Sequence, residues 1–292
     1  MIYIVVGPTA SGKSKYALEL SKHFNDAPIV NADAFQIYKE MDIGTAKVMP
    51  GTHEYQLHHL LDIKSPDEEF SVMEYQKLFR EKVDELSKTH ENIIVCGGTG
   101  LYIKASIYDY VFEELEEDDT SDLEKLSNDE LYEMLIKLDF ESTKIIHKNN
   151  RKRVIRAISI ARSSKTTKSE SVASQEHKLI YPEDSIKIFM IDAPREKIYA
   201  RVNERVDEMV RDGLIEEVKA LLEKYNLSIT ASQAIGYKEV IQYLNGEISL
   251  EESIELIKKR TRNYVKRQLT FFRHQFNCIP VKNLEEILKE AH

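Results

Sequence analysis

The run Gly7-Pro8-Thr9-Ala10-Ser11-Gly12-Lys13-Ser14 decides the fold of this chain. It matches the phosphate-loop pattern GxxxxGK[ST] at every fixed position, and it directly follows the apolar run 2–6. A helical pattern with apolar Tyr16, Leu18, Leu20 and Phe24 comes next. The glycines let backbone N–H groups face an anion, Lys13 can reach the outer phosphates, and Ser14 can ligate Mg²⁺. The sequence therefore predicts a di- or triphosphate site, although the loop alone does not identify the molecule bound.

The composition is that of an ordinary globular protein, with 42% hydrophobic and 31% charged residues among 292. This length allows one large or two modest domains. No apolar run approaches a membrane span, and the first strand leads into the phosphate loop rather than a signal-peptide cleavage site. We therefore expect no membrane partner. Because Cys96 and Cys278 lie far apart and form no metal-spaced pair, we expect a reducing, cytoplasmic setting without zinc.

The charge is distributed unevenly along the chain. A net charge of −9 argues against a nucleic-acid partner. Basic residues are nevertheless concentrated within 151–162 and 258–273. Acidic residues are concentrated at Glu113, Glu114, Glu116, Glu117, Asp118 and Asp119. Local patches decide where a polyanion docks. Each basic run can also be a solvated helix face, but two such runs beside a phosphate site favour RNA.

An alternation of buried strands and helices predicts an α/β core with a parallel sheet. The strand candidates are 2–6, 28–31, 93–96 and 186–191, and the helical patterns include 72–86 and 197–225. We expect three layers with right-handed crossovers. Ligands of such sheets bind beyond the carboxyl ends of the strands. The phosphate loop, Asn31-Ala32-Asp33 and Gly97-Gly98-Thr99-Gly100 should therefore converge on one cleft.

The chain divides into a core and an insertion. We assign 1–110 and 148–292 to a phosphate-loop core with C-terminal helices. Residues 111–147 read as a small helical insertion or lid, with Leu131, Leu135 and Leu138 on its apolar side. The Ser/Thr/Lys-rich segment 163–174 is a flexible connector or a loop ordered on binding. A long helix is expected over 251–276, with aromatic residues in its core-facing stripe.

Eight motifs, taken together and in order, resemble the tRNA dimethylallyltransferase family across most of the chain. Besides the phosphate loop they are NADAFQIY (31–38), MDIGTAK (41–47), HHLLD (58–62), GGTGLY (97–102), 149–157, 205–214, QAIGYKE (233–239) and 264–273. Three departures are visible. Ala34 stands where the family usually has serine, Phe271 where it has tryptophan, and the segment after Tyr110 is short and lacks the family's proline- and arginine-containing pattern.

The resemblance implies a P-loop NTPase-like fold and a prenyl transfer to RNA. Dimethylallyl diphosphate would donate its five-carbon group to the exocyclic amine of the adenosine beside the tRNA anticodon, releasing diphosphate. The N–H groups from Ala10 to Ser14, the Lys13 ammonium and a Mg²⁺ ion on Ser14 would stabilise that leaving group. We expect a monomer with no obligate protein partner, in which the insertion 111–147 contacts the anticodon stem-loop.

Catalytic roles follow by resemblance for Asp33, Thr99 and Arg205. Asp33 is a candidate general base, and the residues alone also allow a helix N-cap or a Mg²⁺-side carboxylate. Thr99 can position the amine or a phosphate. Arg205 is implied to bind diphosphate, although its sequence alone favours a surface salt bridge. Thr9 matches a substrate-contacting threonine and can equally stabilise the loop.

Candidate RNA contacts occupy three segments. A base must leave its stack to reach a buried site, so extrusion of the adenosine is expected. Residues expected near that base are Asp33, Ala34, Phe35, Gln36, Gln233, Gly236, Tyr237 and Lys238, of which Gln36, Gln233 and Lys238 are candidates for base reading. Phosphate contacts are assigned to Lys152, Arg153 and Arg156. His58 and His59 are expected to be structural or RNA-adjacent.

The residues alone leave three other functions open. A small-molecule kinase would use the same loop for ATP, with Asp33 near the acceptor hydroxyl. An adenylate isopentenyltransferase would prenylate free nucleotides, and the basic runs argue for tRNA instead. A non-enzymatic RNA-binding switch would not need Asp33 at all.

Overall fold

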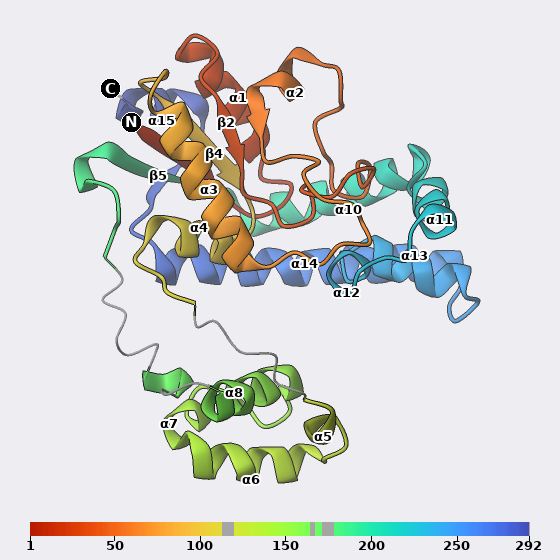
Figure 1. The fold of residues 1–292 in the computed structure, drawn as a ribbon. Coiled ribbons are helices and arrows are strands. Elements are labelled where there is room, and N and C mark those ends of the chain that lie inside the picture. The colour runs from red at the N-terminus through yellow and green to blue at the C-terminus, as the bar shows by residue number, and fades with distance from the viewer. Residues whose placement is uncertain (113–119, 164–166, 171–177, 292) are drawn as a thin grey trace. The chain divides into compact units, whose positions relative to one another are not determined.

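The computed structural model describes residues 1–112, 120–163, 167–170 and 178–291, and it forms two compact units (Figure 1). The first unit comprises Met1–Ile107 and Tyr181–His292, and the second Tyr108–Ile180. The expected insertion ended at 147, so the boundary lies further along the chain than predicted. The reason is that α8 (Arg151–Ser163) shares a buried core with α6 (Asn128–Leu138).

The first unit is built on a six-stranded sheet in the order β3-β2-β4-β1-β5-β6, with every strand pair parallel. Its strands are β1 (Ile2–Val6), β2 (Ile29–Asn31), β3 (His58–His59), β4 (Ile93–Gly97), β5 (Ile186–Ile191) and β6 (Ile279–Val281). The parallel sheet and four of its strands are confirmed. The sequence analysis did not predict β3 and β6, which have two and three residues.

Helices cover both faces of the sheet. The chain moves one way along the sheet from β1 to β2 and the other way from β3 to β4. Because parallel crossovers are right-handed, α1 (Lys13–His23) and α3 (Val72–Leu86) lie on opposite faces. α1 packs with α15 (Leu284–Ala291) against one face, while α4 (Gly100–Ile107) packs against α3. The predicted three layers are therefore present.

Local sequence explains why α3 begins and where it packs. Ser71 and Glu74 form a reciprocal capping box at its start. Tyr75, Phe79 and Val83 follow at helical spacing and are buried, and the bounds match the expected 72–86. The Tyr75 hydroxyl donates to Asn31 O at 2.7 Å, so the helix also ties down the end of β2.

The C-terminal part of the first unit is helical. Its helices are α10 (Arg195–Arg211), α11 (Leu214–Lys224), α12 (Ile229–Ser232), α13 (Tyr237–Leu244) and α14 (Leu250–Gln275). The single helix expected over 197–225 is wrong, because Gly213 adopts a left-handed conformation (φ 103°) and starts a second helix. The long C-terminal helix is confirmed as α14, and its Phe272 is a core residue.

Smaller elements complete the described chain. The first unit also contains α2 (His53–Leu57) and the 3₁₀ helix Glu183–Ser185, and the second contains α5 (Ser121–Glu124) and α7 (Phe140–Thr143). Leu131 and Leu135 are buried as expected, whereas Leu138 is exposed. The acidic residues 113–119 lie outside the described residues, as does most of the segment 163–174. No helix in the described ranges is long and apolar enough to cross a membrane.

Replacing Tyr75 with phenylalanine should lower the free energy of unfolding by about 1–3 kcal/mol, because the buried Asn31 carbonyl loses a donor. Urea denaturation measures this change. Tyr16→Phe is the matched control, since the Tyr16 hydroxyl makes no hydrogen bond to any described residue, and it should be close to neutral. Equal losses in both variants would contradict this role of the Tyr75 hydroxyl.

Candidate functional site

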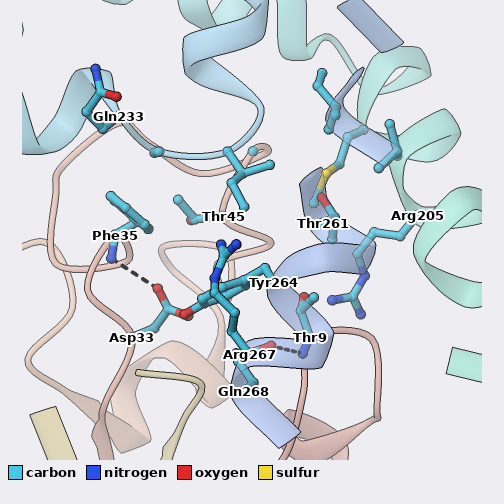
Figure 2. Close-up of a pocket in the computed structure, with 16 residues that line it drawn as sticks. Thr9, Asp33, Phe35, Thr45, Arg205, Gln233, Thr261, Tyr264, Arg267 and Gln268 are labelled. Atoms are coloured by element: carbon cyan, nitrogen blue, oxygen red, sulfur yellow. Dashed lines mark hydrogen bonds between the residues drawn. The ribbon is translucent and has the colours of Figure 1, made fainter. Parts of the chain in front are cut away.

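Three neighbouring strands deliver the predicted polar clusters to one edge of the sheet. β2, β4 and β1 lie side by side, so the segments that follow them meet. A cavity of about 280 Å³ opens there, with Thr9, Asp33 and Arg205 on its wall (Figure 2). The remaining lining residues are Phe35, Gly44, Thr45, Val206, Met209, Gln233, Ala234, Ile235, Ile257, Thr261, Tyr264, Arg267 and Gln268. The phosphate loop and the segment Asn31–Asp33 therefore meet at this cavity as expected, whereas no residue of Gly97–Gly100 lines it.

The phosphate loop has the backbone of an anion site. Ala10 and Gly12 are both left-handed, with φ 61° and 92°. Gly12 is the N-cap of α1 and offers no side-chain cap, so the first N–H groups of that helix keep their binding capacity. One predicted contact needs correction. Ser11 N donates to Pro8 O at 3.2 Å, so its N–H serves the turn of the loop rather than a ligand.

Two cations of this region, Lys13 and Arg205, are desolvated by the protein around them. No described residue forms an ion pair or hydrogen bond with the side chain of Lys13 or Arg205. Burial lowers the pKa of both groups, and Arg205 further lowers the pKa of Lys13 whereas Asp33 raises it. Since desolvated positive charge is unfavourable without a partner, this end of the site favours an anionic ligand. Arg205 forms no salt bridge with any described residue, so the salt-bridge alternative is not supported there, and Arg205 lines the cavity, where diphosphate binding stays a prediction.

Asp33 is held by its own turn beside the cavity (Figure 2). Its Oδ1 accepts from Phe35 N at 3.0 Å, and its backbone N–H donates to Asn31 Oδ1 at 3.1 Å. No helix starts here, so the N-cap interpretation of Asp33 is wrong. The carboxylate is fixed in a half-buried position where it can accept a further proton or hydrogen bond.

Thr99 supports Asp33 from the neighbouring strand end. Its Oγ1 accepts from Ala34 N at 3.0 Å, and its N–H donates to Ala32 O at 3.1 Å. Thr99 is not among the residues that line the cavity. In this structure it therefore fixes the backbone on either side of Asp33.

Glu217 on α11 holds the loop that carries Gly44 and Thr45 into the cavity wall. Its carboxylate accepts from the N–H groups of Asp42, Ile43 and Gly44 at 3.0, 2.7 and 3.2 Å. It also accepts from the Tyr237 hydroxyl at 2.5 Å. Burial and this carboxylate raise the pKa of Tyr237. Sequence reasoning missed Glu217, whose three backbone partners lie more than 170 positions away.

The same loop is anchored at its far end by the buried Lys47. Its ammonium donates to Asp42 Oδ1 at 2.7 Å, to Asp62 Oδ1 at 2.6 Å and to Tyr38 O at 2.6 Å. Asp62 also accepts from the Tyr55 hydroxyl, and burial together with this carboxylate raises the pKa of Tyr55 to about 12. The motifs 41–47 and 58–62 therefore form one buried network that shapes the cavity wall.

Several predicted RNA contacts have structural partners instead. Gln36 donates to Thr45 O at 2.9 Å and braces the loop. Tyr237 is buried against Glu217, and Gly236 is buried with its N–H bonded to Glu239. Tyr237 and Gly236 therefore support the site in this structure rather than face a ligand.

Other predicted contacts remain available. Phe35 and Gln233 line the cavity, Ala34 is half-buried beside Asp33, and Lys238 donates to Gln233 Oε1 at 2.6 Å. In the second unit, Lys152, Arg153 and Arg156 are exposed on α8. His58 and His59 form β3, as their expected structural role requires. The sequence missed Arg267, whose guanidinium lies over the Tyr264 ring at 5.4 Å.

The residues present fit a Mg²⁺ ion held mainly by a bound diphosphate. Ser14 is exposed in the first turn of α1, where its hydroxyl can serve as one ligand. Among the described residues no three His, Cys, Asp or Glu side chains form a metal-binding group. Mg²⁺ commonly takes few protein ligands and completes its shell with substrate phosphates and water.

Glu217→Ala should loosen the loop at Asp42–Gly44. Three backbone N–H groups lose a charged acceptor, so their amide exchange should accelerate by about tenfold or more. Hydrogen–deuterium exchange read by mass spectrometry measures this directly. The adjacent Glu216, which is exposed and pairs with no described residue, provides the control Glu216→Ala. Unchanged exchange in Glu217→Ala would show that the clamp does not hold the loop.

Known proteins resemble this chain over nearly its whole length. A family model described as IPP transferase matches residues 36–275. The tRNA dimethylallyltransferase of Anoxybacillus flavithermus is 45% identical over 276 residues, 94% of this chain and 88% of the relative.

Solved structures agree with this assignment. A tRNA delta(2)-isopentenylpyrophosphate transferase from Staphylococcus epidermidis has a TM-score of 0.71 and 38% identity, with 99% of this chain and 96% of its own covered. A eukaryotic dimethylallyltransferase acting on tRNA reaches a TM-score of 0.81 at 25% identity, covering 99% and 77%. The P-loop NTPase-like fold is thereby confirmed, and the chain belongs to the IPP transferase family.

Proposed function

We propose that this chain transfers a dimethylallyl group from dimethylallyl diphosphate to the exocyclic amine of the adenosine adjacent to the tRNA anticodon. The observation that carries this function is the arrangement of the cavity in a member of this family. Thr9 of the phosphate loop and Arg205 of α10, a cation without an ion pair to any described residue, line this cavity together with the fixed carboxylate of Asp33. A single cavity thus provides for an anionic leaving group and for a nucleophile that must lose a proton.

The donor end stabilises the charge that develops as the carbon–oxygen bond breaks. The electron pair of that bond leaves with the diphosphate. The N–H groups at the start of α1, together with Lys13 and Arg205, are the groups proposed to stabilise that charge. Such preorganised donors are worth about 3–4 kcal/mol each where they have been removed individually. Ser14 and the diphosphate would hold the Mg²⁺ ion, which supplies further charge neutralisation when bound.

The acceptor end activates a weak nucleophile. The adenine amine is a poor nucleophile because its lone pair is delocalised into the ring. As the new carbon–nitrogen bond forms, the nitrogen becomes acidic and Asp33 accepts its proton. Thr99 keeps the backbone of Asp33 in place through Ala34. Phe35 and Gln233 line the same cavity and are the proposed contacts of an extruded adenine.

The substrate is an RNA rather than a small acceptor. The family relatives named above are tRNA dimethylallyltransferases, which supports tRNA over free adenylate and over the acceptor of a kinase. Lys152, Arg153 and Arg156 of the second unit are proposed to contact tRNA phosphates and to position the anticodon stem-loop. A monomeric state and a cytoplasmic setting stay predictions.

Asp33→Asn should lower the rate of prenyl transfer by about 10²–10⁴-fold while tRNA binding is largely retained, because the amide cannot take the proton. Single-turnover transfer of labelled dimethylallyl to tRNA and a filter-binding assay measure the two effects separately. Asp212→Asn, at an exposed position after α10, is the matched control. Full transfer by Asp33→Asn would remove the proposed base, and phosphoryl transfer from ATP in its place would identify a kinase.

The affinity for inorganic diphosphate should fall as pH rises, beginning below the ordinary lysine pKa of 10.5. Burial lowers the pKa of Lys13, so its charge is present below that shifted pKa and is lost above it. In Lys13→Arg the side chain stays charged to higher pH. The decrease in diphosphate affinity that loss of this charge causes should therefore move to higher pH. Calorimetric titrations across pH test this, with the exposed Lys15→Arg as control. Identical pH profiles for all three proteins would contradict the role of Lys13.

A further inference from the structure

Gln268 of α14 connects two loops of the site through its side-chain amide, and Figure 2 shows its contact with Thr9. Its Oε1 accepts from Thr9 N in the phosphate loop at 2.9 Å, and its Nε2 donates to Gly98 O at 2.9 Å. The side chain is only 4% exposed, so water does not readily replace either bond. Because the amide has one accepting and one donating end, these two contacts fix its orientation.

The backbone at Gly98 is shaped around this amide. A Cβ atom at position 98 would lie 2.5 Å from Gln268 Nε2, closer than such atoms can approach. The Gly98 carbonyl also accepts from the Tyr264 hydroxyl at 3.4 Å. The absence of a side chain at this position therefore leaves room for the bridge from α14.

The two contacts reach both halves of the reaction centre. Thr9 N precedes the N–H groups at the start of α1, so its bond to Gln268 leaves the anion-binding groups free. Gly98 adjoins Thr99, whose hydroxyl accepts from Ala34 N beside Asp33. Three hydrogen bonds and the peptide linkages Gly98–Thr99 and Asp33–Ala34 thus connect the phosphate loop through Gln268 to the proposed base Asp33.

We propose that Gln268 is a positioning residue that sets the distance between the leaving diphosphate and Asp33. The inference rests on the proposed function, because it concerns the geometry of that reaction. Prenyl transfer requires the reacting carbon, the leaving oxygen and the attacking nitrogen to be held in line. A displacement of about 1 Å in such a site can cost about 10²-fold in rate.

The Gln268→Glu variant tests this inference through its pH dependence. A charged carboxylate still accepts from Thr9 N but presents an oxygen to the Gly98 carbonyl. The protonated carboxyl can donate to that carbonyl and restore the bridge. We expect single-turnover transfer about 10²-fold below wild type at pH 8. The ratio of variant to wild-type rate should rise as pH falls, and taking the ratio removes pH effects common to both proteins. tRNA affinity should change by less than about twofold.

Gln275→Glu is the matched control, since it makes the same substitution on the same helix. Gln275 is exposed, and its Oε1 accepts from Lys104 at 2.7 Å, a bond that a carboxylate keeps. This variant should transfer at the wild-type rate at every pH. Thermal melting of each variant establishes that the fold is intact.

Gly98→Ala provides an arm without any charge change. The added methyl group must displace the Gln268 amide, so we expect a loss of at least about tenfold in rate with no pH dependence in its ratio to wild type. Wild-type rates in either Gln268→Glu at pH 8 or Gly98→Ala would overturn the proposal. So would a Gln268→Glu loss that is independent of pH and confined to the KM for dimethylallyl diphosphate, which indicates a direct substrate contact.

The two levels of inference fail in different ways. If wild type and Gln275→Glu transfer no dimethylallyl group, the proposed function is wrong. The affinity for inorganic diphosphate then still tests the bridge, because Gly98→Ala should weaken it through the displaced phosphate loop. Unchanged diphosphate affinity in that variant would overturn the bridge itself.

Discussion

The site depends on positive charge that is desolvated and forms no ion pair with any described residue. Lys13 follows the first strand and Arg205 lies on α10, and no described residue pairs with either side chain. Burial lowers the pKa of both groups, which measures how unfavourable their charges are without a partner. In the proposed reaction an incoming diphosphate would relieve that cost, and the growing charge of the leaving diphosphate would relieve it further. The same feature therefore supports both binding and turnover.

A second layer of hydrogen bonds makes this arrangement rigid. Glu217 and Lys47 hold the two ends of the loop around Gly44 and Thr45, while Gln268 connects the phosphate loop with the end of β4. These supporting groups are buried or half-buried and come from different parts of the chain. A charged site of this kind needs such support, because mobile donors would reorganise around the charge instead of stabilising it.

Short-range sequence signals predicted the sheet and the centre of the site. The phosphate loop, Asp33 and Arg205 occupy one cavity edge because parallel strands place their carboxyl ends together. The sequence could not separate residues that touch a ligand from residues that support it. Tyr237 belongs to a motif expected to contact RNA, yet its hydroxyl donates a hydrogen bond to Glu217. Such long-range pairs leave no local period or spacing to read.

The boundary of the second unit was missed for a related reason. The basic residues of α8 predicted an RNA contact. The apolar face of the same helix packs on α6 and determines where the unit ends. The helix break at Gly213 and the short strand β3 likewise depend on one or two residues. Local patterns predict such features poorly because the surrounding tertiary structure decides them.

Mass spectrometry of tRNA after incubation with dimethylallyl diphosphate and Mg²⁺ tests the central claim most directly. The account predicts one added dimethylallyl group on the adenosine beside the anticodon, with one diphosphate released for each group transferred. Arg205→Ala should lower that yield in parallel with diphosphate affinity. An unmodified tRNA, together with phosphate transfer from ATP to a small acceptor, would contradict it.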